Sequence, residues 1–344
     1  MTSTIIKGPL SPMRVVRISL VLCLFLILSI FISLLLGTAD VTLDQLWGLI
    51  IGDPNVKEAV RLIVLKIRLP RILLAGLVGF SLSLGGVVFQ ALLRNPLADP
   101  FILGVSSGSA FGAVLGIMFG LGFSFGIPLM SYAGALLTIF LVLEIGKKKM
   151  GMESSTIILA GVIINAFFTA IIMLFVVTAV DDRLHTMLFW LYGDLSQSNY
   201  NQSIIVFPIV LLAFGVLYGL SRHLNLITAG EETALQLGVD VKKAKLTCFL
   251  VVSLVVGLVV AFSGLIGFVG LVVPHLGRMV LGSDHRLLMP VSALGGAIFL
   301  IAADTLARTV VSPSELPVGV ITAFIGAPFF IYLLKTRGSK WARS

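Results

Sequence analysis

Charged side chains inside apolar runs are the first candidates for chemistry in this sequence, because a charge within a membrane is costly and tends to be functional. Asp304 lies in the apolar run 291–309, and Arg308 follows it four residues later. An acid four residues before a base is the favourable order for an ion pair on one helix face. The pattern fits a structural ion pair, which we favour, or the proton-binding carboxylate of a gradient-driven carrier.

The sequence lacks the machinery for hydrolysing a nucleotide. The phosphate-binding pattern G-x-x-x-x-G-K-[S/T] is absent from the 344 residues. No Ser–His–Asp arrangement and no metal-ligand spacing stands out, and Cys23 and Cys248 both lie in apolar runs. We therefore predict no catalytic residue, no metal site and no cofactor bound by this chain. A separate subunit or an ion gradient must then supply the energy for any energised work.

The segment 221–245 is too short and too polar to cross a bilayer. Glu231 and Glu232 stand where the N-terminus of a helix favours negative charge, and Gly238 is a suitable residue to end that helix. The apolar residues between positions 234 and 237 give the helix an apolar face. Because it lacks the basic polar face of a lipid-binding helix, we expect it to contact a protein partner.

The elements that must position these residues are membrane helices. Hydrophobic residues make up 58% of the chain and charged residues only 12%, against about 25% charged in soluble domains, and the mean hydropathy is +1.11. A bilayer core needs about 20 residues of helix. On this basis we predict an all-α polytopic membrane protein with ten spans: 18–36, 72–93, 103–121, 127–143, 156–180, 204–220, 246–262, 265–281, 291–309 and 318–334.

Basic residues indicate the orientation of these spans. If the termini are cytoplasmic, the predicted cytoplasmic segments hold 17 of the 24 Lys and Arg residues, as the positive-inside rule requires. Residues 1–17 are then a cytoplasmic N-terminal segment and residues 335–344 a cytoplasmic tail. The net charge of +8 reflects this orientation rather than a nucleic-acid partner. Five of the seven external basic residues crowd into positions 57–71, which topology alone does not explain.

The polar stretch from Gln90 to Ala110 joins the second and third spans on the cytoplasmic side. Pro96 and Pro100 prevent one helix from continuing through it. Glycines then recur at every fourth position: Gly104, Gly108, Gly112, Gly116 and Gly120. Such a stripe allows a neighbouring backbone to approach closely. We predict a cytoplasmic corner followed by a tightly packed helix.

Seven motifs occur in one order along the chain and resemble those of one family. They are "RLPR" at 68–71, "QALLRNPLADP" at 90–100, "GVSSGSA" at 104–110, "GEETALQLGV" at 230–239, "GFVGLVVPHLGR" at 267–278, "GSDHRLLMP" at 282–290 and "ELPVGVITAFIGAPFF" at 315–330. After its first residues the chain resembles the FecCD-type permease subunits of binding-protein-dependent ABC importers. These importers take up iron–siderophores, haem and vitamin B12.

The resemblance implies the fold of a type II ABC importer permease, with residues 1–344 as one transmembrane domain of ten helices. It implies a second permease copy, identical or paralogous, with the pathway between the two. It also implies two ATP-binding cassette subunits, which use ATP and magnesium, and a substrate-binding protein. The expected location is the cytoplasmic (inner) membrane, with lipid around the helices.

The resemblance assigns roles to particular residues. The short cytoplasmic helix becomes the element that couples to the ATPase, through Gly230, Glu231, Glu232, Leu237 and Gly238. By the same resemblance, external arginines contact acidic residues of the binding protein. The matching positions are Arg68, Arg71 and Arg308. The alternative for these arginines is that they anchor helix ends by reaching to the lipid headgroups.

Two further sets are expected from position. Arg94, Asn95 and Asp99 of the cytoplasmic corner lie on the side of the ATPase and are expected to shape that contact. Asn165 and Thr169, one turn apart in the fifth span, share a helix face. That face lines the pathway or packs against another helix by hydrogen bonds.

The leading function is an ABC importer permease for an iron chelate such as a ferric siderophore. Vitamin B12 and haem are the alternatives within the family. A proton-coupled carrier that depends on Asp304 and a purely structural membrane scaffold are the alternatives from other classes.

Overall fold

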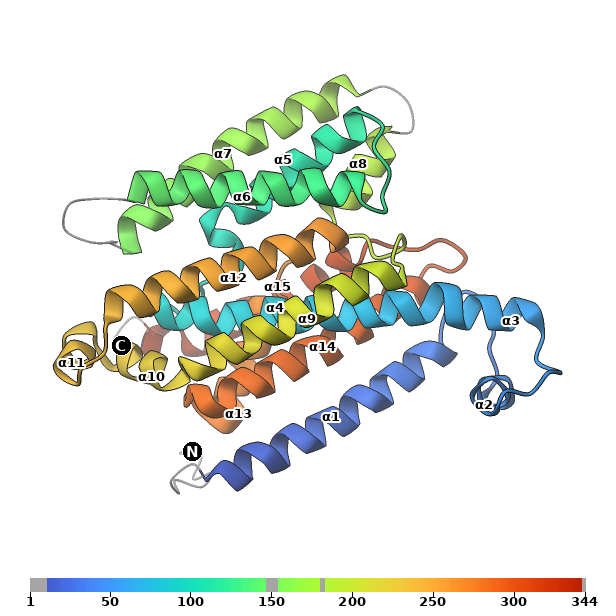
Figure 1. Ribbon diagram of the computed structural model, residues 1–344, viewed down its shortest axis with the longest axis horizontal. Coiled ribbons are helices and arrows are strands. Elements are labelled where there is room, and N and C mark those ends of the chain that lie inside the picture. Colours follow the sequence, from blue (N-terminus) through green and yellow to red (C-terminus); the bar gives the residue numbers. More distant parts are fainter. Residues whose placement is uncertain (1–10, 147–153, 180–182, 342–344) are drawn as a thin grey trace.

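The computed structural model describes residues 11–146, 154–179 and 183–341 (Figure 1). Some sequence-based expectations concern residues outside these ranges. They are residues 1–10 of the N-terminal segment, the basic cluster Lys147–Lys149, Val180 at the end of the fifth span, and residues 342–344 of the tail.

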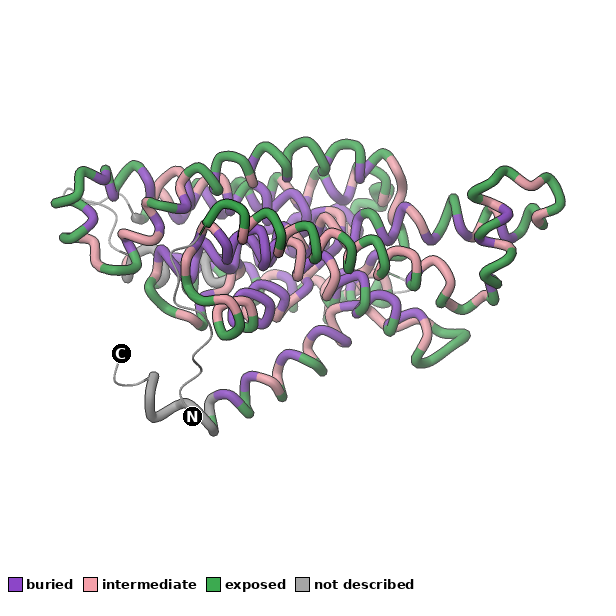
Figure 2. Tube along the Cα trace, turned by 90° about the horizontal axis from the view of Figure 1, so that it is seen from below, coloured by how far each residue is buried: buried purple, intermediate pink, exposed green. Residues whose placement is uncertain are grey.

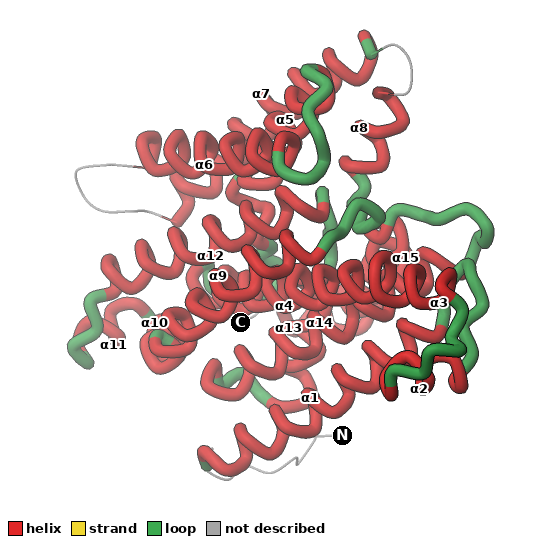
Figure 3. Tube along the Cα trace, turned by 45° about the vertical axis from the view of Figure 1, so that its right-hand side comes forward, coloured by secondary structure: helices red, strands yellow, loops and turns green. Residues whose placement is uncertain are grey.

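The described part of the chain consists of helices joined by loops, without a strand (Figure 3). Each predicted span corresponds to one helix: α1 (Pro12–Leu35), α4 (Leu69–Leu92), α5 (Val105–Met118), α6 (Gly126–Gly146), α7 (Ser154–Thr178), α9 (Tyr200–Gly219), α12 (Val241–Ser263), α13 (Val269–Leu281), α14 (His285–Thr309) and α15 (Val318–Trp341). Of the described helices, seven are long and apolar enough to cross a membrane, and α5, α13 and the apolar part of α15 are shorter. The predicted tail begins inside α15, because that helix continues to Trp341.

Helix α4 is the centre of the bundle, packed against α9, α12, α13 and α14 (Figure 1). Nearly all of its residues are buried, whereas the outer helices expose one face (Figure 2). The contact with α14 depends on Gly79 and Gly296, since a methyl group on either would overlap the backbone carbonyl of the other. Small residues at such crossings let membrane helices gain van der Waals contact.

Helices α5, α6 and α7 form a second group beside the first, seen at the top of Figure 1. The glycine stripe of α5 makes the predicted close contact. Added methyl groups at Gly108 and Gly112 would overlap Gly134 and Met130 of α6. The stripe ends sooner than predicted, because α5 stops at Met118. Gly120 adopts a left-handed φ of 69° in the following turn and has open space around it.

The predicted start of the second span at Ile72 was wrong. A continuous helical segment runs from Glu58 to Leu92, formed by α3 (Glu58–Leu62), a π-helical stretch (Ile63–Arg68) and α4. Pro70 has no N–H to donate, so the π-helical carbonyl of Leu65 lacks its backbone partner. The hydroxyl of Tyr200 donates to that carbonyl instead, at 2.5 Å. The basic residues of this segment lower its hydropathy, which is why a criterion based on hydropathy missed this part of the helix.

Five short helices lie outside the predicted spans. They are α2 (Leu43–Ile51), α3, α8 (Arg183–Leu191), α10 (Ser221–Ala229) and α11 (Glu231–Gln236). Helix α2 begins with a capping box, in which Thr42 and Gln45 exchange hydrogen bonds between side chain and backbone. Only α11 was expected from the sequence.

Candidate functional sites at the two ends of the bundle

Helix α11 projects from one end of the bundle between α10 and α12 (Figure 1). Glu231 and Glu232 lie in its first turn, as predicted. Gly238 follows the last helical residues with a left-handed φ of 83°, which confirms its predicted position after the C-terminus of the helix. Gly230, at the start of the helix, has a φ of 145° that side-chain-bearing residues rarely adopt.

The predicted apolar face of α11 divides into two parts. Ala234 is fully buried in a small core with Ile227 of α10 and Val241 of α12. Leu235 and Leu237 are 58% and 63% exposed. The inner part of the face therefore fixes the helix to the bundle, while two leucines remain available to another molecule.

Glu231 connects α11 to two other elements. Its carboxylate accepts a hydrogen bond from Nζ of Lys245 on α12 at 2.6 Å and lies 3.9 Å from Nη2 of Arg94 in the corner. Glu232 is exposed. Glu231 thus connects α11 to α12 and to the corner, whereas Glu232 is exposed on the same short helix as the two leucines.

The corner that the sequence predicts to be cytoplasmic lies at the same end as α11. Arg94 has a φ of 47°, uncommon for a residue with a side chain, and both Arg94 and Asn95 are exposed. Asn95 accepts a hydrogen bond from the backbone N–H of Leu97 at 2.9 Å and so stabilises the turn. Asp99 caps a 3-10 helix (Pro100–Leu103) by accepting from the N–H of Phe101 at 2.8 Å. Asp99 therefore has a structural partner within the corner.

A polar cavity of about 610 Å³ lies between this corner, α10, α13 and the start of α14. Two of its walls are joined by Gln90, which donates to the carbonyl of Gly270 at 3.2 Å and accepts from Nη2 of Arg278 at 2.7 Å. Asn225 of α10 donates to Asp284 at 2.9 Å. No role was predicted for Gln90, Arg278, Asn225 or Asp284 from the sequence, although an Asp directly before an apolar helix is a typical N-cap signal.

Asp284 is the negatively charged group of this cavity. Hydrogen bonds from the Arg286 side chain, and secondarily from Asn225, lower its pKa to about 2. Asp284 thus remains ionised at every pH at which a cell operates, and its contribution to stability is lost as the pH falls from the ordinary pKa of 3.8 through the lowered value of about 2.

Three arginines predicted to be exposed are buried at the opposite end of the bundle. Arg68, Arg71 and Arg308 are only 3%, 5% and 4% exposed. The expectation of exposed charges was therefore wrong for all three. Binding of another protein by these arginines stays a prediction, which their burial does not support. Anchoring to lipid headgroups is excluded, because the guanidinium groups are buried.

Internal partners explain the burial of these arginines. Arg71 donates to Asp304 at 2.8 Å and to Glu315 at 2.6 Å, and Arg308 donates to Asp304 at 3.1 Å. The predicted pair of Asp304 and Arg308 is therefore confirmed, within a larger network. Arg68 donates to the carbonyls of Leu34 and Leu35 in the last turn of α1 and to the carbonyl of Ala39 in the loop that follows. Carbonyls in the last turn of a helix have no partner within the helix, which is why this arginine fits there.

The candidate pathway residues lie on one open face of α7. Asn165 and Thr169 are both exposed, whereas Phe168 is buried and stacks on Phe111 of α5 with ring centroids 4.9 Å apart. Within the described chain the shared polar face thus packs against no other helix. Lining of the pathway by this face stays a prediction.

Comparison with known proteins identifies the family. Residues 25–336 match the FecCD transport family. The cobalamin import system permease protein of Halobacterium salinarum is 45% identical over 283 residues, which cover 82% of this chain and 76% of that protein. The hemin transport system permease protein of Yersinia pestis is 38% identical over 322 residues, or 91% and 95% of the two chains.

A solved structure also matches. A metal-chelate type ABC transporter in an inward-facing conformation is 36% identical, with a TM-score of 0.81 over 93% of this chain and 99% of that one. With its apolar spans and these relatives, the chain is an integral membrane protein with the fold of an ABC transporter permease and belongs to the FecCD transport family.

Proposed function

We propose that this chain is the transmembrane permease subunit of an ATP-driven importer that moves an iron chelate, such as a ferric siderophore, across the cytoplasmic membrane. The observation that carries the proposal is α11, a short helix fixed to the bundle by buried Ala234 and presenting Leu235 and Leu237 outward. A firmly mounted apolar surface suits the transfer of rigid-body motion, which requires contact rather than chemistry. Membership of the FecCD transport family supports an ABC importer, a transporter in which such motion is used.

The ATPase contact is assigned to the outward side of α11. Gly230, Glu232, Leu237 and Gly238 border this surface, and Arg94 and Asn95 of the corner lie at the same end. Motion of α11 reaches the core by two routes, through Glu231 to Lys245 on α12 and through Glu231 to Arg94 beside α4. ATP and magnesium are used by the partner subunit in this proposal.

The end that carries α11 is assigned to the cytoplasm. The first residues of α1 and the last residues of α15 lie toward the same end, and the distribution of basic residues favours that orientation. The opposite end, with α2 and α3, then faces the substrate-binding protein. A second permease copy, identical or paralogous, completes the pathway, and the polar face of Asn165 and Thr169 is the candidate lining.

Cobalamin is the second candidate substrate, and one observation favours it. A relative named for cobalamin import is 45% identical to this chain, whereas a relative named for hemin is 38% identical. The structural neighbour is described as a metal-chelate type transporter. These names share one chemical class, a metal ion enclosed in an organic ligand.

The proton-coupled alternative receives less support from the geometry. Asp304 is fully buried and accepts hydrogen bonds from both Arg71 and Arg308. A buried carboxylate held between two guanidinium groups has the geometry of a structural ion pair rather than of a proton carrier.

Transport by the reconstituted complex tests the proposal. The permease, its ATPase and its binding protein are placed in vesicles and offered a ferric siderophore, cobalamin and haem in parallel. We expect uptake that requires ATP and persists when the proton gradient is collapsed. The ligand that is taken up identifies the substrate. Uptake that continues without ATP and stops when the gradient collapses would falsify the proposal.

A further inference from the structure

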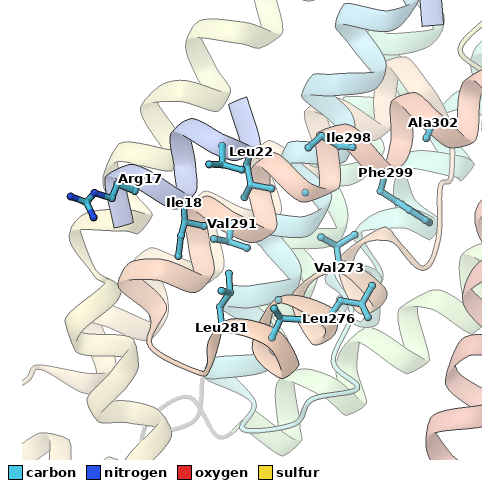
Figure 4. A pocket seen from close by; sticks show the side chains of 14 residues that line it. Arg17, Ile18, Leu22, Val273, Leu276, Leu281, Val291, Ile298, Phe299 and Ala302 are labelled. Carbon is cyan, nitrogen blue, oxygen red and sulfur yellow. The ribbon is translucent and has the colours of Figure 1, made fainter. Parts of the chain in front are cut away.

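A groove of about 700 Å³ opens between α1, α13 and α14, near the first half of α1 (Figure 4). Apolar residues and glycines line it, among them Val273, Leu276, Val291 and Phe299. Arg17 is the only charged residue in the lining and stands at one edge of the groove. The groove therefore combines a long apolar interior with one cation at its rim.

The groove exists because α1 is attached to the bundle mainly through its second half. There Ser33 is buried, and its hydroxyl lies 2.7 Å from that of Thr305 and 2.8 Å from Nη2 of Arg308. Only 6% of the apolar window of α1 is buried overall. A second hollow, of about 410 Å³, shares Gly295 of α14 with the first and continues along α1 toward Ile32. The groove and the second hollow thus form one open apolar surface that follows α1 from Arg17 toward Ile32.

The occupant of the groove must be apolar and thin. Water has no polar partners along this lining and would not fill it. Val291 and Ala302 both line the groove, eleven residues apart on α14, which corresponds to about 16 Å of helix. That length is close to one leaflet of a hydrocarbon core of about 30 Å.

The dimensions of the groove suit a lipid chain. A volume of about 700 Å³ over a length of about 16 Å accommodates an extended hydrocarbon chain.

Charge at the rim indicates the headgroup. Arg17 is exposed, and within the described chain no acidic residue lines the groove beside it. Arginines at the ends of membrane helices extend toward the lipid headgroups, where a phosphate can supply the missing negative charge.

We propose that this groove is a binding site for one anionic phospholipid, with an acyl chain between α1 and α14 and its phosphate paired with Arg17. The lipid fixes the half of α1 that protein contacts leave loose. The site does not depend on the transported substrate or on the ATPase partner.

Native mass spectrometry of the full chain tests the site, after equilibration in nanodiscs of equal phosphatidylglycerol and phosphatidylcholine. We expect one retained lipid per chain, enriched in phosphatidylglycerol. Arg17→Gln at the exposed rim should reduce the preference for phosphatidylglycerol about fivefold. Gly295→Leu should fill the groove and remove the retained lipid. The controls are Arg14→Gln, which removes an arginine of α1 outside the groove lining, and Gly215→Leu, which adds the same side chain to an open position of α9.

Three results would overturn the proposal. Equal lipid retention by Gly295→Leu and Gly215→Leu would show that the lipid binds elsewhere. An unchanged lipid preference in Arg17→Gln would exclude a headgroup site at Arg17, and because that side chain is exposed the variant should fold normally. If Gly295→Leu dissociates an oligomer and leaves the lipid content unchanged, the groove is a contact between protein chains rather than a lipid site.

Discussion

Asp304 shows how single residues hold the end of the bundle opposite α11 together. Its carboxylate accepts hydrogen bonds from Arg71 on α4 and from Arg308 on its own helix, and Arg71 also contacts Glu315 in the loop before α15. Two cations and two anions thus balance within one cluster, in which Asp304, Arg71 and Arg308 are buried and Glu315 is partly exposed. Buried charges are tolerated when they are paired in this way, and removal of one partner leaves the others uncompensated.

At this scale, Arg71→Gln should lower the free energy of unfolding by about 3–5 kcal/mol, because Asp304 and Glu315 lose a shared buried partner. The midpoint of thermal unfolding in detergent measures the effect. Arg61→Gln on the same helical segment is the control. Arg61 is half exposed and lies 3.9 Å from Glu58, so the change should be below about 1 kcal/mol. Equal effects of the two variants would contradict a buried structural network.

At the scale of elements, two helices determine what the molecule can do. Helix α11 is held by a small core around Ala234 and by the contact of Glu231 with Lys245, and it leaves Leu235 and Leu237 exposed. Helix α4 forms the rigid axis against which the other helices pack. A partner that pushes on α11 therefore acts on a rigid body rather than on a loose loop.

Leu237→Arg should abolish association with the ATPase, because it places a charge in the middle of an apolar contact. Leu237→Met, which keeps the volume and the apolar character, should preserve the association. Copurification of the ATPase with the membrane-extracted permease measures both variants. Since Leu237 is exposed, neither substitution should alter membrane insertion. Full copurification with Leu237→Arg would remove this residue from the interface.

Gly79→Ala should destabilise the protein by about 1–3 kcal/mol through overpacking, because the new methyl group overlaps the backbone of Gly296 on α14. Gly76→Ala, one turn earlier on α4, is the matched control. Its methyl group would lie 3.5 Å from Cδ1 of Ile301, an ordinary contact. Thermal unfolding of both variants measures the difference, and a loss of stability no greater for Gly79→Ala would contradict the close crossing of α4 and α14.

At the scale of the whole molecule, the two ends of the bundle differ in chemistry. One end carries α11, the corner and a polar cavity of about 610 Å³. The other carries α2, α3 and the buried cluster of arginines and acids. This asymmetry supports the proposed arrangement, with an ATPase at the end of α11 and a binding protein at the opposite end.

Labelling from the two sides of the membrane tests this arrangement. In a protein with Cys23 and Cys248 replaced by alanine, a single cysteine at Gln236 in α11 should react only from the cytoplasm. A single cysteine at Asn55, in the exposed loop before α3, should react only from outside. A membrane-impermeant maleimide applied to intact cells and to inverted vesicles distinguishes the sides. Reaction of both positions from one side would contradict the assigned topology.

Local sequence was enough to predict the helical membrane class, the approximate positions of the spans and the place of α11. These properties depend on local composition: apolar length decides whether a helix can cross a bilayer, and acidic residues and glycine determine where α11 begins and ends. The contact of the α5 glycine stripe with a neighbouring helix also follows from local spacing. The pair of Asp304 and Arg308 could be predicted because its members are four residues apart on one helix.

The accessibility of the arginines and the partners that join distant elements depend on the tertiary structure and could not be predicted from local sequence. Arg71 meets Asp304 across 233 positions of sequence, and Arg68 meets the end of α1 because α3, the π-helical stretch and α4 form one helical segment. A basic residue near a predicted helix end has the same local pattern whether it faces water or a buried carboxylate. Which of the two it meets depends on how the helices pack, and that information lies in contacts between segments rather than in any one of them.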